Sequence, residues 1–238
     1  FPEVLEKTRL EDKEKRPDMY EHIWDGGFLI YSEGSYYQAE MRRAKDEGRI
    51  KNVGYDRGTG VVVSFDLGIG DSTSLWFAQF IGTEVHLIDY YEGSGVGLEH
   101  YAKVLQDKGY VYDQYVFPHD VRVRELGSGK SRLETLESLG LHADKTEIAP
   151  QLLIDDGIQQ VRAMLDKCWF DEEKCERGID ALLNYQREWD DNGKTWRMRP
   201  KHNWASHGAD AMRYLAVGYQ PYNASWDKPI KRNLKGVV

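Results

Sequence analysis

Three aspartates stand where a carboxylate is unexpected, and their positions are suited to binding metal ions. Asp66 ends the apolar run Val61–Phe65, where an unpaired charge is expensive to bury. Asp120 follows the string Phe117-Pro118-His119, and Asp210 lies among small residues in the string SHGADAMRY. Each also has a structural interpretation: a salt bridge for Asp66, a turn cap for Asp120, and complementarity to the helix dipole for Asp210. Together, however, the three supply a set of oxygen ligands.

Oxygen ligands of this kind are what hard cations such as Mg²⁺ and Mn²⁺ prefer. Two such ions about 4 Å apart hydrolyse a phosphodiester when one carboxylate bridges them and other ligands flank the pair. One ion then generates the attacking hydroxide, and the other stabilises the leaving oxygen. Since the end of the first strand is the natural bridging position, we expect Asp66 to bridge the ions and Asp120 and Asp210 to flank them.

Three further residues are reserve candidates for this site. Asp89, inside the apolar run Leu87-Ile88-Asp89-Tyr90, is the alternative to Asp120. Asp71 lies close to Asp66 in sequence, either as an outer ligand or as a turn cap. His207 precedes Asp210 by about one helical turn, where it could protonate a leaving group, orient a ligand or simply cap and pack.

The segment beyond Asp120 is predicted to be a basic loop beside the site. Its side chains are suited to contact DNA phosphates, or else form a solvated charged surface; they are Arg122, Arg124, Lys130 and Arg132. The same segment contains GSGKS, which is similar to part of a P-loop. The full P-loop pattern requires glycine where this sequence has Arg124, so we expect no ATP binding here.

The elements that must position these residues follow from the hydrophobic pattern. Short apolar runs predict strands at 61–66, 74–80, 84–91, 113–117 and 146–148. Helical spacing predicts helices at 35–47, 97–108, 131–139, 156–167, 171–190 and 206–217, and 193–203 is predicted to be a loop or hairpin. Three strands, a helix, a strand and then mostly helices is the order of an α/β domain of the ribonuclease H-like class, a mixed sheet flanked by helices.

Composition permits one domain with its own core, because the chain has 238 residues and 40% of them are hydrophobic. We expect residues 1–55 to be a linker and lead-in, 56–220 the ribonuclease H-like domain, and 221–238 a mobile basic tail. The two cysteines, Cys168 and Cys175, are too few for a disulfide framework and are expected on one helix face. No apolar run approaches the roughly 20 residues that span a bilayer, so no membrane partner is expected.

The net charge of −8 argues against tight DNA binding by this chain alone, since phosphate neutralisation supplies most of such affinity. It does not argue against a nuclease whose carboxylates bind divalent cations, because the bound metals invert the local charge.

Several strings, in order, are similar to the C-terminal nuclease domain of tailed-phage terminase large subunits: SFDLGIGDSTSLWFAQ, VHLIDYYEGSG, YVFPHD and SHGADAMRY. The lead-in YEHIWDGGF and the block GRIKNVGYDRGTG resemble what precedes that domain, so the resemblance covers about Tyr20 to Gly218. It implies a ribonuclease H-like endonuclease that cuts concatemeric viral double-stranded DNA during genome packaging. The family's acidic triad falls on Asp66, Asp120 and Asp210.

The resemblance also implies partners and a location. They are double-stranded DNA, the viral portal protein, the terminase small subunit and an ATPase domain in a missing N-terminal half, all acting in the host cytoplasm, transiently on the procapsid. The implied cofactors are two divalent cations, Mg²⁺ or Mn²⁺. Three alternatives remain: another ribonuclease H-like nuclease such as a junction resolvase or transposase, a non-catalytic portal or motor coupling module, and a P-loop nucleotide-binding domain that depends on Lys130.

Overall fold

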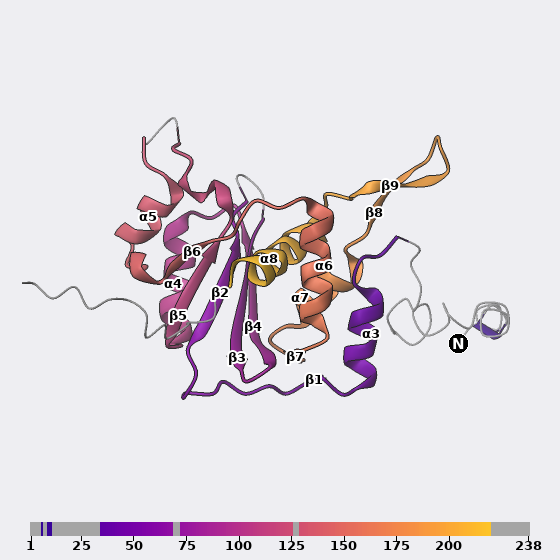
Figure 1. Cartoon of the computed structure of the whole chain (residues 1–238), viewed down its shortest axis with the longest axis horizontal. Helices are drawn as coiled ribbons and strands as arrows, with labels where there is room; N and C mark the ends of the chain where they lie inside the picture. Colours follow the sequence, from indigo (N-terminus) through magenta and orange to yellow (C-terminus); the bar gives the residue numbers. More distant parts are fainter. Residues whose placement is uncertain (1–5, 7–8, 11–33, 69–71, 126–128, 220–238) are drawn as a thin grey trace, which may run out of the picture.

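The centre of the molecule is a mixed sheet, seen in a computed structural model that describes residues 6, 9–10, 34–68, 72–125 and 129–219. In these residues the sheet has seven strands in the order β1-β7-β4-β3-β2-β5-β6 (Figure 1). The strands are β1 (Ile50–Lys51), β2 (Val61–Asp66), β3 (Ser72–Ile81), β4 (Glu84–Ser94), β5 (Tyr112–Phe117), β6 (Thr146–Ile148) and β7 (Cys168–Asp171). A separate hairpin, formed by β8 (Arg187–Asp190) and β9 (Thr195–Pro200), projects beyond the sheet.

The strand directions bring the expected site residues to one edge. Strand β3 is antiparallel to both of its neighbours, whereas β2 and β5, β5 and β6, β4 and β7, and β1 and β7 pair in parallel. Consequently β2, β4 and β5 all end at the same edge of the sheet. This order and these directions are those of the ribonuclease H-like class, so the expected α/β fold is confirmed.

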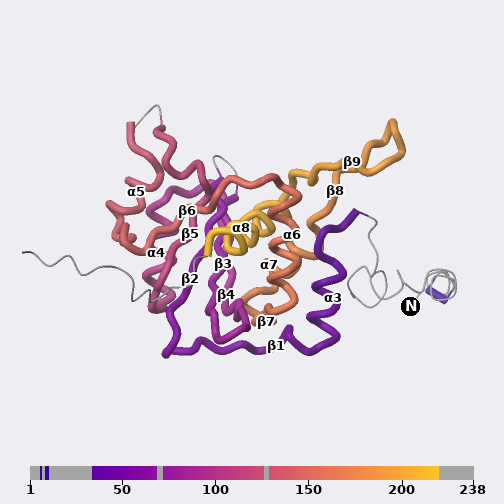
Figure 2. Tube along the Cα trace, viewed as in Figure 1, coloured from indigo at the N-terminus to yellow at the C-terminus, as the bar shows by residue number. Residues whose placement is uncertain are grey.

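Helices cover both faces of the sheet (Figure 2). On one face lie α4 (Leu98–Lys108) and α5 (Arg132–Ser138), which bury their apolar sides against Phe65, Phe77 and Ile88. On the other face lie α3 (Gln38–Asp46), α6 (Ile154–Leu165), α7 (Glu176–Asn184) and α8 (Trp204–Gly218), which pack around Trp76 and Leu87. Two short 3₁₀ turns, His119–Arg122 and Ala143–Lys145, join strands to helices.

Helix α8 approaches the sheet closely because its inner side is made of small residues. The indole Nε1 of Trp76 donates to the carbonyl of Gly208 at 2.8 Å. A Cβ atom at Gly208 would lie 2.8 Å from the Ala181 Cβ and 2.9 Å from the Tyr90 hydroxyl. Small residues therefore let the helix pack closely on the sheet.

Two expectations from the sequence are wrong. The single helix predicted at 171–190 is divided into the end of β7, α7 and β8. Its first residue, Asp171, is extended because it ends β7 and pairs with Lys51 of β1, so tertiary pairing overrides local periodicity. As a result Cys168 and Cys175 do not share a helix face, although both are buried.

Two described elements lie within residues 1–55, the expected linker and lead-in. Helix α3 and strand β1 lie before residue 55, yet Met41 is fully buried in the core and Ile50 pairs with Phe170 of β7. The body of the domain therefore includes residues that the sequence pattern assigned to a linker. The expected tail at 221–238 and most of residues 1–33 lie outside the described residues.

Candidate active site

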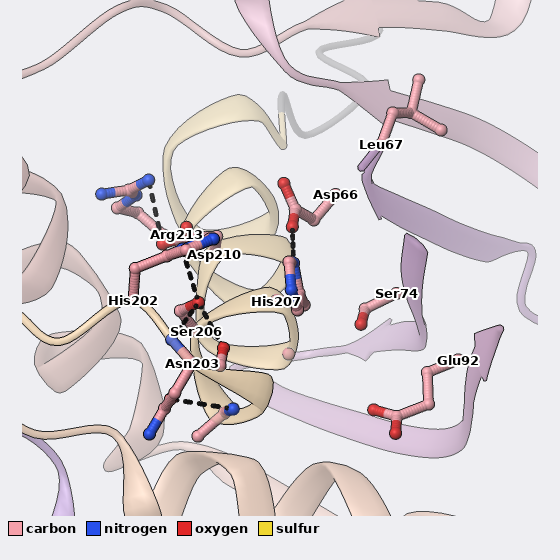
Figure 3. A network of polar contacts seen from close by, with 12 residues as sticks. Asp66, Leu67, Ser74, Glu92, His202, Asn203, Ser206, His207, Asp210 and Arg213 are labelled. Atoms are coloured by element: carbon pink, nitrogen blue, oxygen red, sulfur yellow. Dashed lines mark hydrogen bonds and ion pairs between the residues drawn. The ribbon is translucent and has the colours of Figure 1, made fainter. Parts of the chain in front are cut away.

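Asp66 and His207 face each other across the interface between the sheet and α8 (Figure 3). Strand β2 delivers Asp66 at its last position, and its carboxylate Oδ2 lies 3.1 Å from the Nδ1 atom of His207. Burial raises the pKa of Asp66 above its usual value, while the hydrogen bond from His207 acts in the opposite direction. The negative charge of Asp120 adds to the rise. The end of β2 thus carries a carboxylate that is costly to ionise, and the hydrogen-bond partner of this carboxylate among the described residues is a histidine.

Asp210 lies one helical turn beyond His207, on the same helix. The first turn of α8 is fixed by a capping box between Asn203 and Ser206, and this sets the rotation of the helix about its axis. Burial, together with the charge of Asp66, raises the pKa of Asp210 to about 6 against the opposing effect of Arg213. The Nη2 atom of Arg213 lies 3.0 Å from the Asp210 Oδ1 atom. Two carboxylates that resist ionisation therefore stand close enough to influence each other.

Asp120 reaches the same edge from β5. The 3₁₀ turn His119–Arg122 follows β5 after Pro118, and Arg132 of α5 donates to the Asp120 Oδ2 atom at 2.9 Å. The same guanidinium donates to the carbonyl oxygen of Leu67 at 2.9 Å. Arg132 thereby ties Asp120 to the residue that follows Asp66. About half of the Asp120 side chain, 47%, remains exposed.

The structure does not bring Asp89 to this edge. Its Oδ2 atom contacts the Lys108 ammonium at 2.5 Å and accepts from the Tyr110 hydroxyl at 2.9 Å, and its Oδ1 atom accepts from the backbone of Tyr90. The side chain is only 7% exposed, so these groups provide hydrogen bonds and an ion pair to a buried carboxylate in the middle of β4. Asp89 therefore has a structural explanation. Asp71, another reserve candidate, lies outside the described residues.

The four basic residues expected to contact DNA are placed differently from one another. Arg122, Arg124 and Lys130 are exposed, and Arg124 forms an ion pair with Glu134 at 3.4 Å. Arg132 is only 7% exposed, and its hydrogen bonds go to protein groups. This differs from the expectation of a DNA-facing side chain, because α5 begins at Arg132 and directs it inward. Residues 126–128 of the GSGKS segment lie outside the described residues.

Two groups at the site were missed from the sequence. Glu92 belongs to a lateral row with Asp66 and Ser74, because Asp66 pairs with Ser74 and Ser74 with Glu92. Its carboxylate contacts Arg177 at 2.7 Å and the Tyr90 hydroxyl at 2.8 Å. Strand pairing alone reveals this row, and the sequence does not give the register.

Arg213 is the other missed group. A signal was available, since it lies three positions after Asp210 on a predicted helix, where side chains of opposite charge meet.

A cavity opens from Asp210 toward the β8–β9 hairpin. Its volume is about 860 Å³, and its lining includes Asp210, Arg213, His202, Trp196 and Arg187. The cavity mixes basic and aromatic side chains with the buried carboxylate. It therefore gives a large substrate access to Asp210.

The residues fit divalent cations in chemistry, though not as a preformed site. In the described part of the chain, no group of three or more His, Cys, Asp or Glu side chains is arranged to hold a metal ion. Asp66 and Asp210 nevertheless bring largely buried oxygen donors together, and the charge of Asp66 raises the cost of ionising Asp210. A hard cation is the partner that such a pair of carboxylates favours.

Comparison with known proteins gives matches only at the level of structure. No family model and no curated protein matches the chain. The large terminase of the thermophilic bacteriophage D6E is 18% identical with a TM-score of 0.56, covering 87% of this chain and 51% of its own. This chain therefore spans about half the length of that protein.

Two isolated nuclease domains are also similar. That of the P22 large terminase is 14% identical with a TM-score of 0.51, covering 72% of this chain and 88% of its own. That of the thermophilic phage G20c large terminase, solved with bound magnesium, is 11% identical with a TM-score of 0.52, covering 78% and 98%. The chain thus has the ribonuclease H-like fold of the nuclease domains of phage large terminases.

Proposed function

We propose that this chain is a metal-dependent DNA endonuclease of the terminase type, which hydrolyses phosphodiesters with two divalent cations, Mg²⁺ or Mn²⁺. The observation that carries the proposal is the proximity of Asp66 and Asp210, two largely buried carboxylates with raised pKa values, the second of which lines a cavity. Buried acids of this kind in a cleft are typical of functional sites. The fold shared with terminase nuclease domains, one of them solved with magnesium, supports the same proposal.

Each residue has a defined role in this proposal. Asp66, at the strand end, would hold the two cations together with Asp210 and Asp120. When bound, the cations supply an activated water and stabilise the charge on the leaving oxygen. His207 holds the Asp66 carboxylate in place through its Nδ1 contact, and Arg132 holds Asp120.

DNA phosphates are proposed to contact the exposed side chains of Arg122, Arg124 and Lys130. With a net charge of −8, the chain neutralises few phosphates on its own. It therefore cuts well only when another component holds the DNA against it. We propose that this component is a terminase ATPase domain, with the portal protein and small subunit as further partners in the host cytoplasm, and that the substrate is concatemeric viral double-stranded DNA.

No helix among the described residues is long and apolar enough to cross a membrane.

The test is cleavage of plasmid DNA by the purified chain at low salt with Mn²⁺. Replacing Asp66 with Ala is expected to lower the rate at least about 10³-fold, because the bridging ligand is lost. The matched control is Asp107→Ala, an exposed aspartate on α4 whose contact is a surface ion pair with Lys103. Equal rates for Asp66→Ala and the control would overturn the proposal, as would efficient, salt-resistant cutting without a divalent cation.

A further inference from the structure

Arg213 is a positively charged side chain that forms an ion pair with Asp210, one of the proposed metal ligands. Its Nη2 atom lies 3.0 Å from the Asp210 Oδ1 atom, and its side chain is only 16% exposed. Ion pairs between residues three positions apart on exposed helices contribute little to stability, because they break and re-form in solvent. This pair is largely withdrawn from water, so Arg213 is a stable counter-ion of Asp210.

The neighbouring helix is shaped to hold the side chain there. A Cβ atom at Gly157 of α6 would lie 2.5 Å from the Arg213 Cδ atom and 2.9 Å from its Cγ atom. The guanidinium also lies 5.5 Å from the centre of the Tyr214 ring. Glycine at 157 therefore leaves a slot through which Arg213 passes to reach Asp210.

The charge of Arg213 acts on both buried carboxylates. It opposes the rise in the pKa of Asp210 and also the rise in the pKa of Asp66. A divalent cation between these carboxylates would have the same effect, and two positive groups cannot share them without repulsion.

Two cavities beside Arg213 leave space for its side chain to move. It lines the cavity of about 860 Å³ that contains Asp210, and it lines a second cavity of about 190 Å³ bounded by Gly157, Tyr214 and His119. A side chain with spaces on both sides can change rotamer without unpacking the core.

We infer that Arg213 is a resident counter-ion that competes with the divalent cation for Asp210 and leaves this carboxylate when the cation binds. The inference rests on the proposed function, since it takes Asp210 as a metal ligand. In the metal-free protein Arg213 stabilises the acidic cluster, and the cation must break an ion pair before it can occupy the site. Arg213 therefore lowers metal affinity and sets the metal concentration at which the site fills.

The test is calorimetric titration of the metal-free chain with Mn²⁺. Replacing Arg213 with Gln removes the competing charge, so Mn²⁺ is expected to bind roughly tenfold more tightly. Arg213→Lys is the matched control, because it keeps the charge and is expected to stay within about threefold of the parent. The thermal midpoint of metal-free Arg213→Gln is expected to fall, and its increase on adding Mn²⁺ to exceed that of the parent.

A second variant leaves Arg213 in the sequence but blocks its slot. Gly157→Ala places a methyl group on the arginine side chain, so Mn²⁺ is expected to bind more tightly than in the parent. Gly54→Ala is its control, since a Cβ atom at Gly54 meets nothing within 4 Å.

The outcomes separate the inference from the proposed function. If Mn²⁺ binds the parent in a way that Asp66→Ala abolishes, but Arg213→Gln binds equally or more weakly, the inference is overturned and the proposed function stands. If the parent binds no Mn²⁺, or binds it independently of Asp66, both are overturned.

Discussion

The Nδ1 atom of His207 lies 3.1 Å from the Oδ2 atom of Asp66, although 141 positions separate the two residues. Strand β2 presents one and helix α8 the other, and at Gly208 the helix lies close enough to the sheet to accept a hydrogen bond from Trp76 of β3. A carboxylate at the strand end is thereby oriented by a side chain that also lies one turn from Asp210. The contact joins the two elements from which two of the three proposed metal ligands, Asp66 and Asp210, come.

The raised pKa values of Asp66 and Asp210 predict a pH dependence of metal binding. Both carboxylates must ionise to bind a cation, so Mn²⁺ affinity is expected to fall, by roughly tenfold per pH unit for each proton displaced, as the pH drops through the Asp210 pKa of about 6. Calorimetric titrations across this range measure it. Affinity that stays flat from about pH 7 to about pH 5 would contradict the burial of these acids.

The same pKa shifts predict that the folding stability of the metal-free chain decreases as the pH rises. A folded-state pKa above the unfolded value means that the folded state binds more protons, so stability falls as pH rises from about 4 toward the Asp210 pKa of about 6. Urea unfolding in chelator measures this, compared with Asp210→Asn, in which the contribution of Asp210 is absent. Identical pH slopes for the parent and the variant would be the contrary result.

Asp89 and Asp120 are expected to separate stability from activity. Asp89→Asn weakens a buried contact with Lys108 and is expected to cost about 3 kcal/mol of folding free energy, with cleavage per folded molecule unchanged. Asp120→Asn, at a half-exposed position, is expected to change stability by less than about 1 kcal/mol while reducing cleavage at least about tenfold. Urea unfolding and cleavage rates on the same preparations decide it. The reverse pattern would return Asp89 to the metal site.

Arg132 is expected to act as a structural tether. Arg132→Gln removes hydrogen bonds to Asp120 and to the Leu67 carbonyl, with an expected cost of about 1–3 kcal/mol. Arg124→Gln, which loses one exposed ion pair, is expected to cost less than about 0.5 kcal/mol. If Arg132→Gln instead weakened DNA binding at unchanged stability, its proposed role as a phosphate contact would be restored.

The close packing of α8 predicts that Gly208 tolerates no side chain. Gly208→Ala would place a methyl group 2.8 Å from the Ala181 Cβ atom, so we expect a loss of about 1–3 kcal/mol in folding free energy. The helix must also move away from Ala181 and Tyr90, and this movement is expected to change the contact between His207 and Asp66. Chemical denaturation measures the first effect, and a crystal structure of the variant measures the second. An unchanged free energy of unfolding would show that α8 packs less closely.

Much of the fold could be predicted because its central elements have local signals. Strand β2 begins and ends at the residues predicted from its β-branched run, and β3 and β4 follow from a turn at Gly82, whose φ is +61°. The strand at 146–148 was also predicted correctly. Strand β7 was not, because three apolar residues fit a strand or a helix equally well until β4 and β1 pair with them.

The site could be predicted less completely than the fold. Asp66, Asp120 and Asp210 stand out in sequence because each interrupts an apolar or small-residue segment, and the structure brings all three to one edge. The partners of these residues do not stand out. That Arg132 turns inward to Asp120, and that Glu92 aligns with Asp66, depend on long-range packing and strand register. Neither leaves a local signature.

The most direct test is anomalous diffraction from a crystal of this chain soaked in Mn²⁺. The account predicts peaks within about 2.5 Å of carboxylate oxygens of Asp66 and Asp210, with Asp120 as a further ligand and Arg213 displaced from Asp210. An Asp66→Ala crystal soaked in the same way should lose the peak that this residue bridges. Strong manganese peaks elsewhere, with none beside Asp66, would contradict the account.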